Sequence, residues 1–355
     1  MNSNLTKVAA YLMVVLMAFC GNARAANDII IGRTLSLEGP TQSYGQAKLD
    51  GSDAYIAKVN AAGGINGRKI HVVTLNDSYT PAVAVANLKK MASENQPLAF
   101  LGVFGVPVVA AVLPVIDELK IPTVGLTSGV AELRNPGYRY SFPVRADYGT
   151  ESEKLVTHVK TIGVSKLGLI YSDNPFGSAV RGVLEAEMKN QKYTPVVVKV
   201  AADGKDADVA AKSVFDGKPE AVFLGMLTQA AVPVVTSLRK SGFKGTIYAL
   251  SPVDGTQMVK QLQSGAANLA ISQVVPVPDS VRTLVAGEYM QALKSLGRGE
   301  PSFYGLEGFI EAKLLVEGIK RAGPKVTTES LQKSLETFEK FDLGGFMVSY
   351  KPQSH

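Results

Sequence analysis

The sequence predicts an α/β protein made of two doubly wound, Rossmann-like lobes. Short β-rich runs alternate with helical stretches, which is typical of a parallel sheet covered by helices. The alternation starts again after Tyr148, so each half predicts a sheet of its own. The 355 residues are enough for two domains of the usual ~100–200 residues. Two such lobes imply a cleft between them, and ligands of open α/β sheets bind outside the carboxyl ends of the strands.

The first half opens with an apolar run and a loop that contains Ser36, Glu38 and Gly39. The glycines of residues 63–67 are expected to end the first helix, because glycine readily adopts the left-handed conformation of a helix C-cap. The expected order is strand 29–34, helix 44–62, strand 70–76, helix 81–93, strand 98–102, helix 108–119 and strand 122–125.

The second half repeats this alternation, and the remainder from about Val274 is expected to be mostly helical. The expected order is helix 151–162, strand 166–171, helix 175–190, strand 195–200, helix 207–215, strand 221–225, helix 230–241 and strand 246–249. Helices 280–296, 304–322 and 328–338 follow, with a last short strand at 346–350.

Residues 1–25 have the features of a secretory signal peptide. Lys7 precedes an apolar run of about fourteen residues, and Ala23-Arg24-Ala25 supplies the small residues of a cleavage site. The run is shorter than the ~20 residues that span a bilayer, which disfavours an uncleaved anchor. Phe19 before Cys20 does not fit a lipoprotein signal. We therefore expect export with cleavage after Ala25 and a mature chain without cysteine or disulfides.

The charge of the mature chain is small. Cleavage lowers Lys plus Arg from 37 to 35 against 31 acidic residues, so the net charge falls from +6 to +4. This excess is spread along the chain, and no basic run suits a phosphate backbone, so no nucleic-acid partner is expected. No later apolar segment is long enough to predict a second membrane span.

Catalytic signatures are not apparent in the sequence. The three histidines, His71, His158 and His355, are scattered, and without cysteine no metal cluster has the usual spacing. Phosphate-binding and dinucleotide-binding glycine motifs are not found, and Thr127 occupies the position where a serine nucleophile would stand in G-x-S-x-G. The sequence therefore predicts a protein that is not an enzyme and needs no cofactor or metal.

Several motifs occur in an order that is specific. They are the turn at 36–40 (Ser-Leu-Glu-Gly-Pro), the helix at 54–68 with Gly-Gly-Ile-Asn-Gly, the acidic strand end Asn76-Asp77 and the turn at 171–177 ending in Phe-Gly. Together they resemble the periplasmic binding proteins of branched-chain amino acid ABC transporters, of the leucine/isoleucine/valine type. The resemblance covers essentially all of the mature chain.

The resemblance implies the type I, Venus-flytrap fold, in which three segments form a hinge between discontinuous lobes. Lobe one would comprise residues 26–146 with 274–341, and lobe two 147–273 with 342–355. Crossings would fall near 144–146, 274–277 and 343–345. Such proteins usually continue past the third crossing into a further strand, whereas this sequence stops at His355, and this departure leaves the completeness of lobe two an open question.

The resemblance also implies a site for a zwitterion. Thr127, Ser128 and the helix start at Val106 would bind the carboxylate, since helix N-termini favour anions, and Asp254 would bind the ammonium. Purely structural roles remain the alternatives to ligand binding: an apolar helix start at Val106, a plain turn at 127–129, and a helix cap at Asp254. The expected walls of the cleft are Glu38, Tyr44, Tyr148, Phe176 and Met226.

The apolar residues at key positions point away from a standard aliphatic amino acid. Val106 stands where amino-acid binders carry a hydroxyl, and Met226 and Leu227 stand where relatives often carry tyrosine. The ligand expected is an amino acid or an aromatic or aliphatic carboxylate. We expect a periplasmic, monomeric component of an ABC importer that delivers its solute to an inner-membrane permease. The alternative is a sensing module that signals occupancy to a receptor or regulator.

Overall fold

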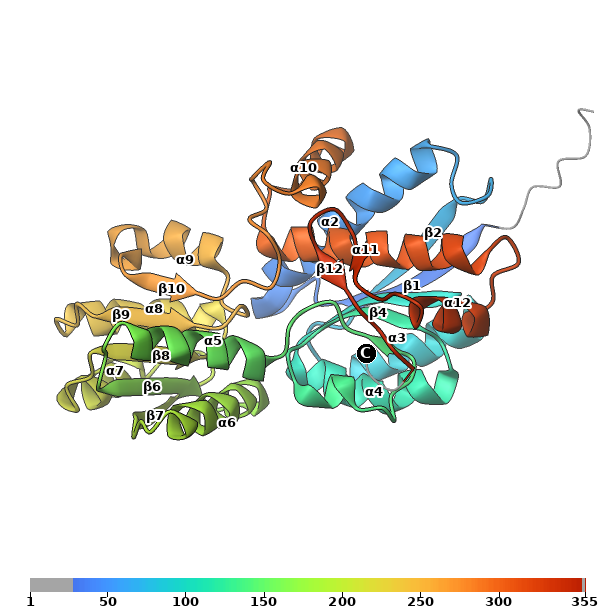
Figure 1. Cartoon of the computed structure of the whole chain (residues 1–355). Helices are drawn as coiled ribbons and strands as arrows, with labels where there is room; N and C mark the ends of the chain where they lie inside the picture. Colours follow the sequence, from blue (N-terminus) through green and yellow to red (C-terminus); the bar gives the residue numbers. More distant parts are fainter. Residues whose placement is uncertain (1–27, 353–354) are drawn as a thin grey trace, which may run out of the picture.

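Two α/β lobes lie side by side in the computed structural model, which describes residues 28–352 and 355 (Figure 1). The predicted signal peptide lies outside the described residues. Each lobe contains one five-stranded parallel sheet with helices on both faces, so the predicted fold class is confirmed. No helix of the described part is long and apolar enough to cross a membrane.

Lobe one is built on a sheet with the strand order β2-β1-β3-β4-β5. One apolar core joins this sheet to helices α2 and α10–α12, and a second joins the opposite face to α3 and α4. The elements are β1 (Ile29–Leu35), η1 (Gly39–Thr41), α2 (Gln42–Ala61), β2 (Ile70–Asn76), α3 (Pro81–Glu94), β3 (Ala99–Phe104), α4 (Val106–Leu119), β4 (Thr123–Thr127), η2 (Ala131–Arg134), β5 (Ser141–Phe142), α10 (Leu284–Leu296), α11 (Phe303–Ala322), α12 (Thr328–Leu335), β11 (Phe341–Asp342) and β12 (Met347–Val348).

Lobe two has the sheet order β10-β9-β8-β6-β7. Helices α5 and α6 cover one face, and α7, α8 and α9 cover the other, each over its own apolar core. The elements are α5 (Tyr148–Thr161), β6 (Leu167–Ser172), α6 (Pro175–Asn190), β7 (Val196–Val200), α7 (Ala207–Asp216), β8 (Ala221–Gly225), α8 (Thr228–Lys240), β9 (Thr246–Ala249), α9 (Gly255–Leu262), η3 (Gln263–Ala266) and β10 (Leu269–Ile271).

Helices α2 and α11 of lobe one pack with their backbones almost in contact. A Cβ atom added to Gly51 would lie 1.8 Å from the carbonyl oxygen of Gly305, and one added to Gly308 would lie 2.5 Å from the carbonyl oxygen of Lys48. Only glycine permits this approach. The close packing brings Lys48 on α2 next to the acidic side chains of α11.

The C-terminal segment belongs to lobe one, which corrects the predicted assignment of 342–355 to lobe two. Leu343, Val348 and Tyr350 are buried in the core that contains α10–α12, and the Tyr350 hydroxyl donates to the Pro143 carbonyl at 2.8 Å. Burial of these apolar side chains fixes the segment there. The end of the described chain accordingly lies over lobe one in Figure 1.

Two connections between the lobes are present in the described residues. The first runs from β5 to α5 through residues 143–147, and the second runs from β10 to α10 through residues 272–283. The third crossing expected near 343–345 is not found there, because β11 and β12 pair as an antiparallel hairpin on lobe one. Val285 donates its backbone N–H to Gly344 at 2.9 Å, which fixes the hairpin on the start of α10.

Candidate functional site

The carboxyl ends of both sheets meet where the lobes touch, and we call this contact the interlobe seam. On the lobe-one side Tyr44 follows β1 and Val106 follows β3. On the lobe-two side Phe176 follows β6 and Thr228 follows β8. Ligands of open α/β sheets bind at such strand ends, so the seam is the candidate site.

Tyr44 links the two lobes directly. Its hydroxyl lies 2.6 Å from Thr228 Oγ1 and 3.2 Å from the Pro252 carbonyl oxygen, and it accepts the backbone N–H of Thr228 at 3.1 Å. Burial raises the pKa of Tyr44 well above its ordinary value, so the neutral hydroxyl makes these bonds. The predicted ligand contact is therefore, in this structure, a bond between the lobes.

An aromatic cluster surrounds Tyr44 on the lobe-one side. The Tyr44 ring stacks on Phe104 at a centroid distance of 5.0 Å and meets the edge of Tyr304 at 4.8 Å. Tyr79 lies against Phe104 at 5.6 Å. Stacked and edge-to-face pairs of this kind favour a rigid, apolar wall.

A second apolar cluster spans the seam at Val106, Tyr148 and Phe176, which the structure brings together. The rings of Tyr148 and Phe176 meet edge to face at 6.1 Å. All three side chains are buried, so Val106 of lobe one packs within a core that otherwise belongs largely to lobe two.

Ser128 and Tyr148 are also neighbours. The backbone N–H of Tyr148 donates to the Gly129 carbonyl at 2.7 Å, which holds the start of α5 against the loop after β4. Burial raises the pKa of Tyr148, while Arg145 and a hydrogen bond with the Ser128 side chain act in the opposite direction. Ser128 is fully buried.

Thr127 faces a buried charge inside lobe one. Its hydroxyl accepts a hydrogen bond from Lys48 Nζ, and the same ammonium lies 2.6 Å from Glu311 Oε1. A second buried pair lies near the first crossing, where Arg145 Nε donates to Glu307 Oε1 at 3.0 Å. Burial acts to raise the pKa of Glu307, but the positive charge of Arg145 stabilises the ionised carboxylate, and the pKa is lowered overall.

Asp254 is the N-cap of helix α9, which is the purely structural alternative expected for this residue. Its Oδ1 atom accepts the backbone N–H groups of Thr256 at 3.0 Å and Gln257 at 3.2 Å. Burial raises the pKa of Asp254, and the two N–H donors oppose the shift. Its own N–H donates to Thr228 Oγ1 at 2.8 Å, so Asp254 adjoins the Tyr44 contact.

Two predicted wall residues are not brought into the seam clusters. Glu38 is exposed on the loop before η1. Met226 is buried in the core between the lobe-two sheet and helices α7–α9, whereas its neighbour Leu227 packs against the cluster that holds Tyr148. Both residues directly follow β8, and the alternation of side chains along an extended backbone accounts for their opposite orientations.

The sequence interpretation missed several residues of the seam. Phe104 ends β3 and Tyr79 follows β2, so the strand-end rule would have found both. Tyr304 lies in the first turn of α11, and Thr228 opens α8; neither has a local signal that relates it to Tyr44. Lys48 is also unforeseen, because one lysine within a helix is usually exposed.

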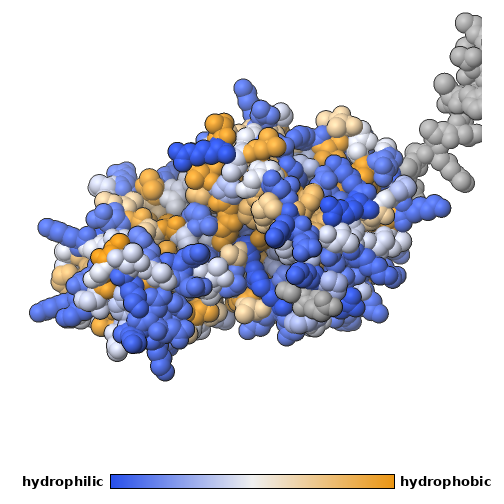
Figure 2. All heavy atoms as spheres, viewed as in Figure 1, coloured by the Kyte–Doolittle hydropathy of each residue, from blue (hydrophilic) through white to orange (hydrophobic). Residues whose placement is uncertain are grey.

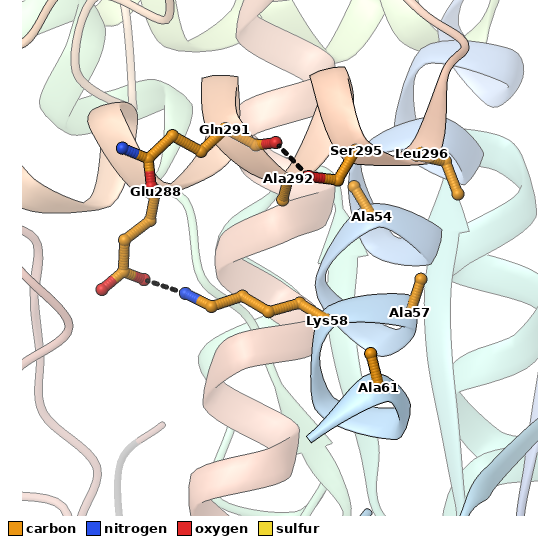
Figure 3. Close-up of a pocket in the computed structure, with 9 residues that line it drawn as sticks. All are labelled: Ala54, Ala57, Lys58, Ala61, Glu288, Gln291, Ala292, Ser295 and Leu296. Atoms are coloured by element: carbon orange, nitrogen blue, oxygen red, sulfur yellow. Dashed lines mark hydrogen bonds and ion pairs between the residues drawn. The ribbon is translucent and has the colours of Figure 1, made fainter. Parts of the chain in front are cut away.

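Two pockets differ in how they relate to the lobes. A pocket of about 450 Å³ lies between α2 and α10, where Lys58 Nζ is 3.6 Å from Glu288 Oε2, and every lining residue belongs to lobe one (Figure 3). A pocket of about 370 Å³ spans the seam and is lined by Ser43 and Tyr44 of lobe one and by Gln257 of lobe two, among others. Of these two pockets, only the second has lining residues from both lobes.

The molecular surface is mostly hydrophilic on the face shown in Figure 2, with apolar side chains gathered near the junction of the lobes. The segment that leads into α10 exposes Val277, Val281 and Leu284. Among the described residues, no three His, Cys, Asp or Glu side chains come together as a metal site requires.

The fold and the seam are those of a bilobal solute-binding protein. Residues 28–355 match a family described as periplasmic binding protein, and the chain belongs to this family. The match confirms the predicted family resemblance and gives the protein a solute-binding role.

Relatives and solved structures agree with this assignment. The chain is similar to Leu/Ile/Val-binding protein homolog 3 of Brucella melitensis biotype 1, with 21% identity over 334 residues, 94% of this chain and 89% of the relative. It is 24% identical over 226 residues to an amino acid binding protein of Pseudomonas aeruginosa, across 62% of this chain and 60% of that relative. The structure of a substrate-binding periplasmic protein from Ralstonia solanacearum has a TM-score of 0.86 and 29% identity, covering 92% of this chain and 96% of that one.

Proposed function

We propose that this protein is the extracytoplasmic solute-binding component of an ABC importer, and that it captures an amino acid or a related small carboxylate between its lobes. The observation that carries the proposal is the seam itself, where the strand ends of both sheets meet at Val106, Phe176 and Thr228. The names of the relatives, an amino acid binding protein and a Leu/Ile/Val-binding protein homolog, support this class of ligand.

The chemistry of the seam supports a solute with an acidic group and an apolar body. Lys48 donates to the Thr127 oxygen and leaves the Thr127 hydrogen available to donate at the end of β4, and Ser128 adds a second hydroxyl. Val106 and Phe176 supply the apolar surface. Asp254 supplies the carboxylate that an ammonium group would need.

Closure of the lobes is the mechanism that this arrangement supports. A solute shifts the equilibrium between open and closed forms only if it interacts better with one of them. A ligand in the seam contacts both lobes and gains most of its contacts on closure, whereas a ligand between α2 and α10 contacts lobe one alone. The closed form would then be recognised by an inner-membrane permease, with the protein acting as a periplasmic monomer and without catalytic activity.

The test is identification of the solute. Native mass spectrometry of the protein purified from the periplasm, followed by isothermal titration with leucine, phenylalanine and benzoate, should detect a carboxylate that binds one to one. A co-purifying solute without a carboxyl group, together with no heat for the three probes, would overturn the proposed ligand class.

A further inference from the structure

A hydrogen-bonded chain connects the second crossing segment to the seam. It begins at Ser272, immediately after β10, and passes through Glu151 in the first turn of α5 to the loop at Ser251 and Pro252. On the other side of the seam, Tyr44 reaches the carbonyl oxygen of Pro252 at 3.2 Å. This series of hydrogen bonds therefore joins the second crossing segment to the interlobe seam.

Glu151 is the centre of this chain. Its Oε2 atom accepts the backbone N–H of Ser251 at 2.8 Å and the Ser272 hydroxyl, and its Oε1 atom accepts the Ser251 hydroxyl at 2.9 Å. The side chain is almost fully buried, with Arg145 as a nearby positive charge. A buried carboxylate with three donors has one well-defined position, because losing any donor leaves its charge poorly compensated.

Two tyrosines of lobe one meet the loop that Glu151 holds. Tyr44 contacts the Pro252 carbonyl and both the N–H and hydroxyl of Thr228, and the Tyr304 hydroxyl donates to the Ser251 carbonyl at 3.4 Å. The two rings pack edge to face, so they move together with lobe one.

We propose that Tyr44 and Tyr304 form a latch between the lobes, and that Glu151 is the positioning residue that holds the receiving loop and couples it to the second crossing. The latch stabilises the closed form independently of which solute is bound. It therefore goes beyond the proposed function and sets the fraction of the protein in the closed form. A solute that binds the closed form has an apparent affinity that scales with this fraction.

The experiment measures the distance between the lobes in the purified mature protein. Spin labels on the exposed positions Lys90→Cys in α3 and Lys189→Cys in α6 report the opening by double electron–electron resonance. Residues 26–355 contain no cysteine, so the labels are specific. Tyr44→Phe removes the latch hydroxyl, and Tyr55→Phe, on the same helix but packed against Phe309 in the lobe-one core, is the matched control.

Glu151 needs two variants. Glu151→Met removes all three acceptor contacts, while Glu151→Gln can keep them, because a rotated amide accepts the Ser251 N–H and Ser272 hydroxyl through oxygen and donates to the Ser251 hydroxyl. Thermal unfolding of each variant establishes that it is folded. A merely structural role would change the unfolding temperature without changing the distance between the lobes.

In the unsubstituted protein we expect a dominant short distance. Tyr44→Phe and Glu151→Met should each lower the ratio of closed to open forms about five- to tenfold, as expected for the loss of one or two hydrogen bonds, while Tyr55→Phe and Glu151→Gln stay close to the original distribution. A distribution unchanged by Tyr44→Phe, or one already open before substitution, overturns the latch. A shift in Tyr44→Phe without one in folded Glu151→Met overturns the role of Glu151. These distances can be measured whether or not a solute is bound. A failure of the proposed function can therefore be told apart from a failure of the latch.

Discussion

Lys48 Nζ lies 2.6 Å from Glu311 Oε1, and both side chains are almost completely buried between α2, α11 and the end of β4. Thr127 accepts another hydrogen bond from the same ammonium. A buried ion pair costs desolvation of both charges, and its main effect is felt when one partner is removed. The pair therefore couples the hydroxyl at the strand end to the helix that contains Glu307 and Glu311.

Breaking this pair should cost more than removing it completely. At pH 8, where Glu311 is ionised beside Lys48, we expect Lys48→Met to lower the free energy of unfolding by about 3–5 kcal/mol, because Glu311 must then either stay buried as a charge without its partner or take up a proton. The double substitution Lys48→Met with Glu311→Met should recover most of the loss. Urea unfolding of both single variants and the double variant measures the coupling between the two side chains. Additive losses would show that the two side chains do not interact energetically.

The pH dependence of stability should contain a contribution from Glu311. Burial raises the pKa of Glu311 to about 7, with Lys48 opposing and Glu307 adding to the shift, and Arg145 opposing it from the first crossing. The unfolded chain releases this proton near pH 4.5, so between about pH 4.5 and 7 the folded state binds one proton more than the unfolded state. The contribution is full below that range and is lost as the pH rises through it.

The measurement is urea unfolding of the unsubstituted protein and of Glu311→Gln between pH 4.5 and 8. Glu311 should contribute a decrease of about 1 kcal/mol per pH unit in the free energy of unfolding, and Glu311→Gln should remove this decrease. Glu339→Gln, at an exposed position of the same lobe, is the control that keeps it. If Glu311→Gln and the unsubstituted protein show the same slope, the raised pKa is wrong.

Most of the regular elements follow from local sequence patterns. The strand Ile70–Asn76 and the helix Pro175–Asn190 have the predicted bounds, because an apolar run and a Pro-initiated helix are both local signals. The strands β5 (Ser141–Phe142) and β10 (Leu269–Ile271) are too short to show a period, and they exist because a neighbouring strand offers an edge to pair with.

The side-chain chemistry of the seam was harder to predict than the fold. Lys48 and Glu311 are separated by 263 residues in the sequence, so no spacing rule relates them. The C-terminal residues Leu343 and Val348 are apolar and would suit the core of either lobe; only the packing against α10–α12 decides between them. The sequence shows which strand ends carry aromatic residues, such as Phe104, but it does not show which residues they contact.

Gly125, which lies beside Glu311, and Gly182, an exposed control position, together test how tightly the Glu311 side chain is packed. Gly125 has a positive φ of 82°, and a Cβ atom there would lie 2.2 Å from the Glu311 carboxyl carbon. Gly125→Ala should therefore lower the free energy of unfolding by about 2–4 kcal/mol, through backbone strain and displacement of a buried carboxylate. Gly182, exposed within helix α6 with no atom near the added Cβ, is the matched position.

Gly182→Ala should instead raise the free energy of unfolding by about 0.5–1 kcal/mol, because alanine is the better helix former. Thermal and urea unfolding of the two variants gives the sign of each change. If Gly125→Ala is as stable as the unsubstituted protein, the Glu311 side chain moves easily away from the added methyl group.

Asp254→Asn separates the two roles that Asp254 can have. Asparagine is as good an N-cap as aspartate, so α9 should keep its first turn and the free energy of unfolding should change by less than about 0.5 kcal/mol. If the Asp254 carboxylate also binds an ammonium group, the charge is essential for that contact. Affinity for an amino acid should then fall about tenfold or more, while affinity for the matching acid without the amino group is kept.

The measurement is isothermal titration with leucine and with 4-methylpentanoate, which lacks only the amino group. Asp147→Asn is the control, because Asp147 caps α5 in the same way, accepting the Thr150 N–H at 2.8 Å. Equal losses for both ligands would show that Asp254 acts through the structure of α9. Unchanged affinity for leucine would leave Asp254 a helix cap alone, and the ammonium pole of the proposed site would then have to lie on another residue of the seam.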